Sequence, residues 1–213
     1  MPEPVKTRRY ASPLRQQQAE RTRRAVLRAA RTLFTTRGYA DTSVAEVARR
    51  AKVSVDTVYA SVGRKPQLLL AVHDMLLGDA DEPVPAEERD YVRAIRAAGT
   101  AEEKIAVYAQ ALGELLPRTA PLMEALREAA RTDAGCAAAW KQVTERRAAN
   151  MLLFARDLRA TGRLREDLTD QEVADVVWST NAVEFYALLA ARGWDGRRVG
   201  TLLEDLWTRL LLE

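Results

Sequence analysis

The sequence predicts an all-α protein, with an N-terminal helix-turn-helix domain followed by a larger helical domain. Three observations support this fold class. The 213 residues include only 10 Gly and 8 Pro. Apolar side chains recur at the spacing of helices, without the alternation that is typical of strands. Paired Ser/Thr and Glu capping signals mark several helix starts.

Four helices are expected in the first 78 residues, at about 13–37, 44–51, 55–61 and 66–78. Pro13 opens the first helix and Gly38 stops it. Ser43 and Glu46 form a capping box for the second helix, and Ser54 caps the third after a short turn. Two short helices joined by so tight a turn predict a helix-turn-helix.

The rest of the chain predicts a second helical domain, so we expect domains at 1–78 and 79–213. An acidic stretch that contains prolines, residues 79–85, connects them. Helices are expected at about 86–98, 101–116, 120–132, 135–161, 170–191 and 197–212.

The net charge of +3 hides an uneven distribution of charge. Residues 1–78 carry 15 basic and 6 acidic side chains, whereas residues 79–213 carry 18 basic and 24 acidic ones. A basic head on an acidic body indicates a polyanionic partner. The alternative is a basic face that meets only solvent.

Catalytic and metal sites find little support in the composition. The single Cys136 gives no disulfide framework or multi-thiolate zinc site, and the single His73 removes most histidine chemistry. We therefore expect no catalytic site, metal or cofactor, and interpret both residues as structural. No transmembrane run or signal peptide is visible, so we expect a cytoplasmic protein without a membrane partner.

Short motifs follow one another between residues 26 and 69. They are VLRAARTLF at 26–34, Gly38-Tyr39, Thr42-Ser43-Val44, Glu46-Val47-Ala48, Val53-Ser54, Thr57-Val58-Tyr59, Lys65 and Leu68-Leu69. Together they resemble the start of the tetracycline-repressor (TetR) family of bacterial transcription regulators. Further on, Trp178, Glu184-Phe185-Tyr186 and Gly193-Trp194 are similar to a pattern in one subset of that family.

Two positions depart from the family pattern. Lys52 stands in the turn where glycine is common, and Val62 replaces an aromatic residue after the third helix. Either Lys52 accepts the backbone angle that the turn needs, where a positive φ would cost about 1 kcal/mol, or the turn differs slightly.

The resemblance implies a set of DNA contacts. In a helix-turn-helix, the N-terminal residues of the second helix face base edges in the major groove. Here these are Ser54, Val55, Asp56 and Thr57, then Tyr59 and Ala60 one turn on. The family positions for phosphate contacts are Thr42, Ser43, Tyr59 and Lys65.

Several of these residues have a second interpretation. Asp56 reads cytosine N4, or it only favours the helix dipole and faces solvent or Lys52. Tyr59 binds phosphate, or its ring belongs to the core. Arg8, Arg9 and Arg15 form an arm on the DNA backbone or in the minor groove, or a solvated tail.

For the second domain the resemblance implies a pocket for an apolar or amphipathic small-molecule effector. Candidate lining residues are Tyr91, Tyr108, Leu112, Met123, Trp140, Arg147, Met151, Phe154 and Glu184. The aromatic and Met positions equally suit an ordinary core. Arg147 and Glu184 lie on apolar stripes, where an internal ion pair or an interface contact is expected before ligand binding.

The last two expected helices, within 170–212, predict a dimer interface. Their apolar faces carry Trp178, Leu188, Leu189, Leu202, Leu206 and Leu210. Two such helices per subunit would form a four-helix bundle. We expect a homodimeric repressor that binds a pseudo-palindromic double-stranded DNA operator and is released by its effector. The alternative is a small all-helical enzyme or carrier that uses the pocket and has lost DNA binding.

Overall fold

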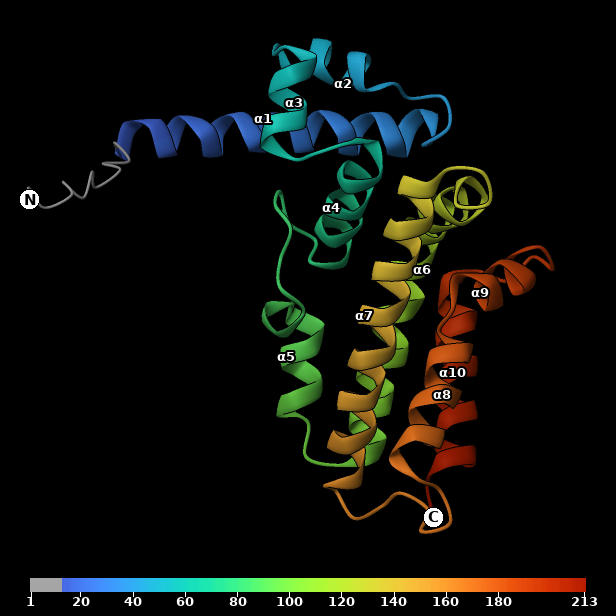
Figure 1. Cartoon of the computed structure of the whole chain (residues 1–213). Coiled ribbons are helices and arrows are strands. Elements are labelled where there is room, and N and C mark those ends of the chain that lie inside the picture. Colours follow the sequence, from blue (N-terminus) through green and yellow to red (C-terminus); the bar gives the residue numbers. More distant parts are fainter. Residues whose placement is uncertain (1–12) are drawn as a thin grey trace, which may run out of the picture.

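The computed structural model describes residues 13–213, which form ten α-helices and one short 3₁₀ helix (Figure 1). The helices are α1 (Pro13–Arg37), α2 (Val44–Ala51), α3 (Val55–Ser61), α4 (Lys65–Leu77), η1 (Ala86–Glu88), α5 (Asp90–Ala97), α6 (Ala101–Ala129), α7 (Ala134–Arg159), α8 (Asp170–Thr180), α9 (Val183–Ala190) and α10 (Gly196–Leu211). The all-α fold class predicted from the sequence is confirmed.

Helices α1 to α4 pack around one face of α1. Val26, Ala30 and Phe34 are four residues apart and therefore lie on the same side of that helix, where all three are almost completely buried. Helices α2, α3 and α4 each contact α1. The N-terminal part of α1 extends beyond these partners (Figure 1).

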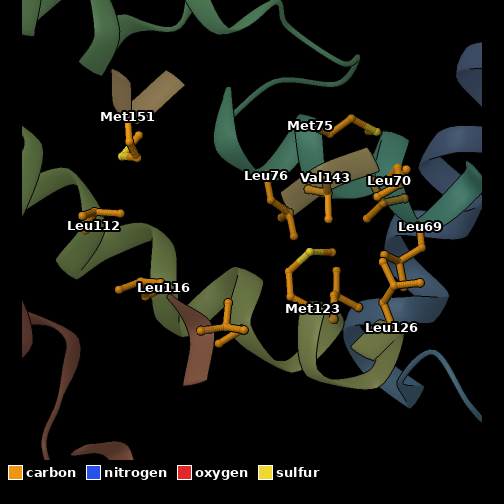
Figure 2. Close-up of a cluster of buried hydrophobic side chains, with 14 of the residues drawn as sticks. Leu69, Leu70, Met75, Leu76, Leu112, Leu116, Met123, Leu126, Val143 and Met151 are labelled. Carbon is orange, nitrogen blue, oxygen red and sulfur yellow. The ribbon is translucent and has the colours of Figure 1, made fainter. Parts of the chain in front are cut away.

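Helix α4 links this head to the rest of the molecule. It contacts α1 on one side and both α6 and α7 on the other. Leu76 of α4, Met123 of α6 and Val143 of α7 gather in one buried cluster (Figure 2). The apolar core therefore continues from the helix-turn-helix into the helical body. A movement of α4 would change the packing of both parts.

The body is built on the two longest helices, α6 and α7, which lie side by side (Figure 1). Helix α5 packs on α6, α8 packs on α7, and α10 runs along α6. The α10–α6 contact is a backbone contact. A Cβ at Gly196 would overlap the carbonyl oxygen of Gly113, and a Cβ at Gly200 would lie 2.9 Å from the carbonyl oxygen of Ala109. Only glycine allows the two helices to approach so closely.

The expected break between 116 and 120 is wrong, because α6 is continuous from Ala101 to Ala129 with Pro117 and Pro121 inside it. Each proline removes one backbone hydrogen bond. Buried side chains precede, separate and follow the two prolines, among them Leu116, Thr119 and Met123. Tertiary packing of this face outweighs the local tendency of proline to end a helix.

The single helix expected over 170–191 is also wrong, because the chain leaves helical geometry at Asn181 and Ala182. Asn181 is 4% exposed, and its Nδ2 donates to the Tyr108 hydroxyl at 2.9 Å. This buried contact holds Asn181 at the end of α8, and the extended backbone of Ala182 then starts α9 in a new direction.

The helix expected over 86–98 is interrupted at its beginning. The 3₁₀ helix η1 ends at Glu88, and Arg89 has extended backbone before α5 begins. The Arg89 side chain is buried, and its Nε donates to the carbonyl of Val84 at 3.1 Å. With its side chain turned inward, Arg89 has extended backbone and separates η1 from α5.

Candidate functional site

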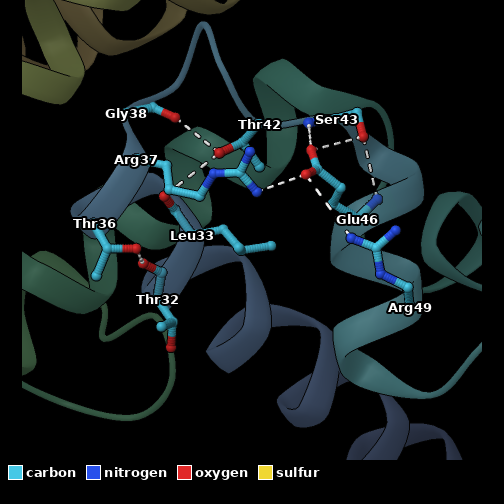
Figure 3. Close-up of polar contacts among 9 residues, drawn as sticks. All are labelled: Thr32, Leu33, Thr36, Arg37, Gly38, Thr42, Ser43, Glu46 and Arg49. Atoms are coloured by element: carbon cyan, nitrogen blue, oxygen red, sulfur yellow. Dashed lines mark hydrogen bonds and ion pairs between the residues drawn. The ribbon is translucent and has the colours of Figure 1, made fainter.

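The helix-turn-helix is held by local capping interactions. Ser43 accepts a hydrogen bond from the backbone N–H of Glu46, and Glu46 accepts one from the backbone N–H of Ser43 (Figure 3). Together with the guanidinium of Arg37 at 2.6 Å, the Ser43 N–H lowers the pKa of Glu46 to about 2. The carboxylate is therefore charged at the start of α2, where it favours the helix dipole.

Lys52 adopts the positive φ that its position in the turn suggested. Its φ of 59° and ψ of 42° lie in the left-handed region, and its N–H bonds to the carbonyls of Ala48 and Arg49. A side chain in this conformation costs about 1 kcal/mol relative to glycine. The turn has this geometry despite the cost.

Helix α3 presents its N-terminus to solvent. Ser54 caps it by accepting from the Thr57 N–H at 3.1 Å, and Val58 is the buried residue that anchors it. Ser54, Asp56 and Ala60 are exposed, whereas Val55 and Thr57 are half-buried. Tyr59 is 46% exposed, so its interpretation as plain core is wrong.

Among the phosphate candidates, Thr42 needs correction. Its side chain is 1% exposed, and its hydroxyl donates to the carbonyl of Gly38 at 2.8 Å (Figure 3). This hydroxyl supports the turn before α2 and is not available to DNA. Ser43 is exposed beside it.

Lys65 lies at the start of α4 on the same side as these residues. Its Nζ is 4.2 Å from the centre of the Tyr39 ring and donates to the carbonyl of Ala40 at 3.4 Å. Partial burial lowers its pKa. Of the expected arm, Arg15 is exposed on α1, and Arg8 and Arg9 lie outside the described residues.

A cavity of about 450 Å³ lies between α4, the η1–α5 segment, α6 and α7. It brings together eight of the nine candidate ligand residues, namely Tyr91, Tyr108, Leu112, Met123, Trp140, Arg147, Met151 and Phe154. Its volume is within the range of roughly 300–1,000 Å³ usual for small-molecule sites.

Glu184 is the exception and does not line the cavity. It stands at the start of α9, where its Oε1 lies 3.6 Å from Nε of Arg127. Both side chains are more than a third exposed, so this is a surface ion pair. The chain changes direction at Asn181 and Ala182, before Glu184. The prediction of one continuous helix placed Glu184 on the wrong face because it did not contain this break.

The cavity wall also contains polar residues that the sequence did not single out for ligand binding: His73, Arg89 and Asn181. His73 was interpreted as structural, and it is indeed buried, but it borders the cavity. A histidine next to an aspartate inside the otherwise apolar stretch 68–77 was the available signal. Cys136 is a buried structural thiol, 3.4 Å from the Tyr39 hydroxyl.

Asp74 ties α4 to two other walls of the cavity. It accepts from Nη2 of Arg89 at 3.1 Å, and from Nη2 and Nη1 of Arg146 at 2.7 and 2.9 Å. Burial would raise the pKa of Asp74, but the adjacent His73 and Arg146 lower it by more. The ionised carboxylate therefore joins α4 to α7 and to the residue between η1 and α5.

Among the dimer candidates, Leu188 and Leu210 lie on outward faces, whereas Trp178 has a buried Nε1 and packs against Arg147 of the cavity wall. Leu188 and Leu210 are 72% and 40% exposed, and Trp178, Leu189, Leu202 and Leu206 are half-buried. On α10, Leu203 and Trp207 point inward and are fully buried. The final helix therefore has two apolar faces, of which one packs within the chain and one does not.

Within residues 13–213, no helix is long and apolar enough to cross a membrane. Nor does this part of the chain gather three His, Cys, Asp or Glu side chains that could hold a metal ion.

An exposed α3 in a helix-turn-helix, joined to a helical body with a cavity, is the arrangement typical of all-helical DNA-binding regulators with a ligand-binding domain. Residues 26–72 match the family described as bacterial regulatory proteins, tetR family. The helix-turn-helix part of the chain is therefore similar to that of TetR-family regulators, and the chain as a whole shares its fold with solved regulators of this kind. A search of curated proteins finds no match.

Solved structures with the same fold share little sequence with this chain. A TetR-family transcriptional regulator from Rhodococcus sp. is 17% identical with a TM-score of 0.67, and the alignment covers 91% of this chain and 100% of that one. A transcriptional regulator from Saccharomonospora viridis in complex with choline has the same identity and TM-score, with 91% and 99% covered. SmeT, the repressor of the Stenotrophomonas maltophilia multidrug efflux pump SmeDEF, is 20% identical with a TM-score of 0.61, with 91% and 93% covered.

Proposed function

We propose that the protein is a homodimeric repressor that binds a pseudo-palindromic operator and is released when a small molecule occupies the cavity. The observation that carries this proposal is the position of α4. The helix begins beside the helix-turn-helix at Lys65, and it ends in the cavity wall at His73 and Leu77.

The DNA-binding part of the proposal assigns two kinds of contact. The exposed N-terminus of α3, with Ser54, Val55 and Thr57, enters the major groove and reads bases. Ser43, Tyr59 and Lys65 hold the phosphate backbone around it. Asp56 is exposed beside them, where it either accepts from a cytosine or only favours the helix dipole.

The dimer part rests on the outward apolar faces. Leu188 and Leu210 are large side chains with high exposure on neighbouring helices, and Leu206 lies one turn before Leu210. A second copy that covers these leucines removes apolar surface from water. With two helices from each subunit, the interface is a four-helix bundle that sets the spacing between the two recognition helices.

The release step works through Asp74. Arg89 and Arg146 both line the cavity and both bind Asp74 of α4. A ligand that moves either arginine changes how α4 is held, and α4 carries the helix-turn-helix with it. The ligand and the operator then prefer different positions of the head, which is the requirement for allosteric release.

Fluorescence anisotropy with labelled DNA from upstream of the protein's own gene, and with random DNA of equal length, tests the proposal. Lys65→Ala should weaken both complexes. It should also reduce the slope of log affinity against log salt concentration by roughly one unit, as expected for the loss of one phosphate contact. Val55→Ala and Thr57→Ala should weaken the upstream complex by about 1–3 kcal/mol and the random complex little.

Equal losses on both DNAs for all three variants would contradict base reading by α3. An absence of DNA binding in a protein that still binds small molecules would instead favour the enzyme or carrier alternative.

A further inference from the structure

Arg147 lies in the cavity wall with much of its hydrogen-bonding capacity unused. Its Nη2 donates to the carbonyl of Trp178 at 2.6 Å, and its guanidinium carbon is 4.7 Å from the centre of the Trp178 ring. Its Nε is buried and has no acceptor. The nearby Glu184 pairs with Arg127 instead, and Arg147 forms no ion pair with any residue between 13 and 213.

The other charged residues of the wall do not compensate Arg147. Arg89 and Arg146 share Asp74, and Asp157 pairs with Lys104 at 2.9 Å. The wall contains four arginines, Arg89, Arg96, Arg146 and Arg147, but only two carboxylates, Glu87 and Asp157. A partly buried cation without a counter-charge is costly, and burial accordingly lowers the pKa of Arg147.

Aromatic residues in the same wall suggest a cationic ligand as the alternative. Tyr91 and Tyr108 are stacked with ring centres 6.2 Å apart, and Trp140 and Phe154 also line the cavity. Such rings bind quaternary ammonium groups elsewhere. Here Arg147 lines the same cavity and its charge acts on the Tyr108 hydroxyl, so a cation at these rings would lie near a like charge. The wall therefore favours an anion.

The cavity has one long wall that is mostly apolar. Its α6 wall runs from Tyr108 to Met123, a length of roughly 20 Å at the rise of an α-helix. Toward α4 this wall is formed by Leu112, Leu116 and Met123. An extended hydrocarbon chain can lie along these side chains while its polar end remains at Arg147.

We propose that the cavity binds an amphipathic carboxylate, with its head on Arg147 and its apolar tail along Leu112, Leu116 and Met123. This assignment names the ligand class of the site and rests on the proposed regulator function. The planar guanidinium matches the geometry of a carboxylate.

Isothermal titration calorimetry on the full chain, with three probes that share one tail, tests the head group. The probes are dodecanoate, dodecanol and dodecyltrimethylammonium, each below its micelle concentration. Dodecanoate should bind at least about tenfold more tightly than the other two, as expected for one charge-assisted hydrogen bond. Arg147→Met should abolish this preference and leave the affinity for dodecanol nearly unchanged. Arg127→Met, which removes an arginine outside the cavity, should keep the preference.

Equal affinities for the three probes, tighter binding of the ammonium probe, or no binding of any probe would overturn the proposal. So would a preference for dodecanoate that survives Arg147→Met. If that variant does not fold, Arg147→Lys keeps the charge but loses the planar fork, and it should reduce the preference without removing it. DNA binding is measured separately. Dodecanoate that binds through Arg147 without changing DNA affinity would refute the effector role while the ligand assignment stands.

Discussion

Replacement of Asp74 by asparagine tests the link between α4 and the cavity. The Asp74 side chain is 15% exposed, and it holds Arg89, which is 6% exposed, and Arg146, which is 41% exposed. The asparagine side chain would keep the shape of the aspartate but remove the charge that both guanidinium groups need. Most of the loss should come from Arg89, because Arg146 is screened by solvent.

The expected loss of unfolding free energy for Asp74→Asn is about 2 kcal/mol. Hydrogen bonds between charged groups contribute roughly 1.5–3 kcal/mol, and breaking a fully buried pair costs about 3–5 kcal/mol. The lower part of this range applies because asparagine can still accept one hydrogen bond. Urea denaturation at equal protein concentration measures the effect as a lower midpoint with an unchanged slope.

Asp79→Asn is the matched control. Asp79 also binds an arginine, Arg118, but its side chain is 75% exposed. An exposed pair of this kind contributes little to stability. If Asp74→Asn proved as stable as Asp79→Asn, Asp74 would not be the anchor of α4 and the coupling route would have to be abandoned. The pKa of Asp74 is lower in the folded protein than in the unfolded chain. Its contribution to stability is therefore present above the ordinary pKa of a carboxyl group and is lost as pH falls through the pKa of the folded state. At acid pH the stabilities of the two variants and of the wild type should converge.

Three further predictions concern stability and assembly. Burial lowers the pKa of His73, so the unfolded chain binds the proton more tightly, and stability should fall as pH drops below about 6.5, by at most about 1.4 kcal/mol per pH unit. His73 is the single histidine. His73→Gln should therefore make the melting temperature less dependent on pH between pH 7 and about 5.5. A pH dependence equal to that of the wild type would contradict a buried neutral imidazole. Gly196→Ala should lower the free energy of unfolding by more than about 3 kcal/mol, because its Cβ would overlap the Gly113 carbonyl and lie 2.7 Å from Cγ of Pro117. Gly99→Ala is the tolerated control in the same denaturation assay, because the atom nearest to its Cβ lies 3.7 Å away. Leu206→Glu with Leu210→Glu should give a monomer or an aggregate in light scattering, and a stable DNA-competent dimer would show that the outer face of α10 is not the interface.

The helix-turn-helix could be predicted closely from the sequence because its signals are local. Ser43 with Glu46, and Ser54 with Thr57, cap their helices within one turn. At Lys52 the sequence left two possibilities, a positive φ or a different turn, and the structure has the positive φ.

The errors arose where distant residues decide the local structure. Pro117 stays helical because its neighbours are buried, and Asn181 breaks a helix because Tyr108, far away in sequence, accepts its hydrogen bond. The pocket itself was implied only by the TetR resemblance, and most of its candidate residues line the cavity because residues such as Arg147, Met151 and Phe154 share one helix face. Arg89 could not, since nothing near it in the sequence indicates that it turns inward to Asp74.

The backbone contact between α6 and α10 has a mechanical consequence. Helices that meet through side chains can slide past one another, because rotamer changes absorb small displacements. Gly113 and Gly196 leave no side chain to absorb them, so we expect α6 and α10 to move together. One side of this helix pair forms the wall of the cavity and the other side carries Leu206 and Leu210. We therefore expect a displacement of α6 by a bound molecule to shift the outer face of α10.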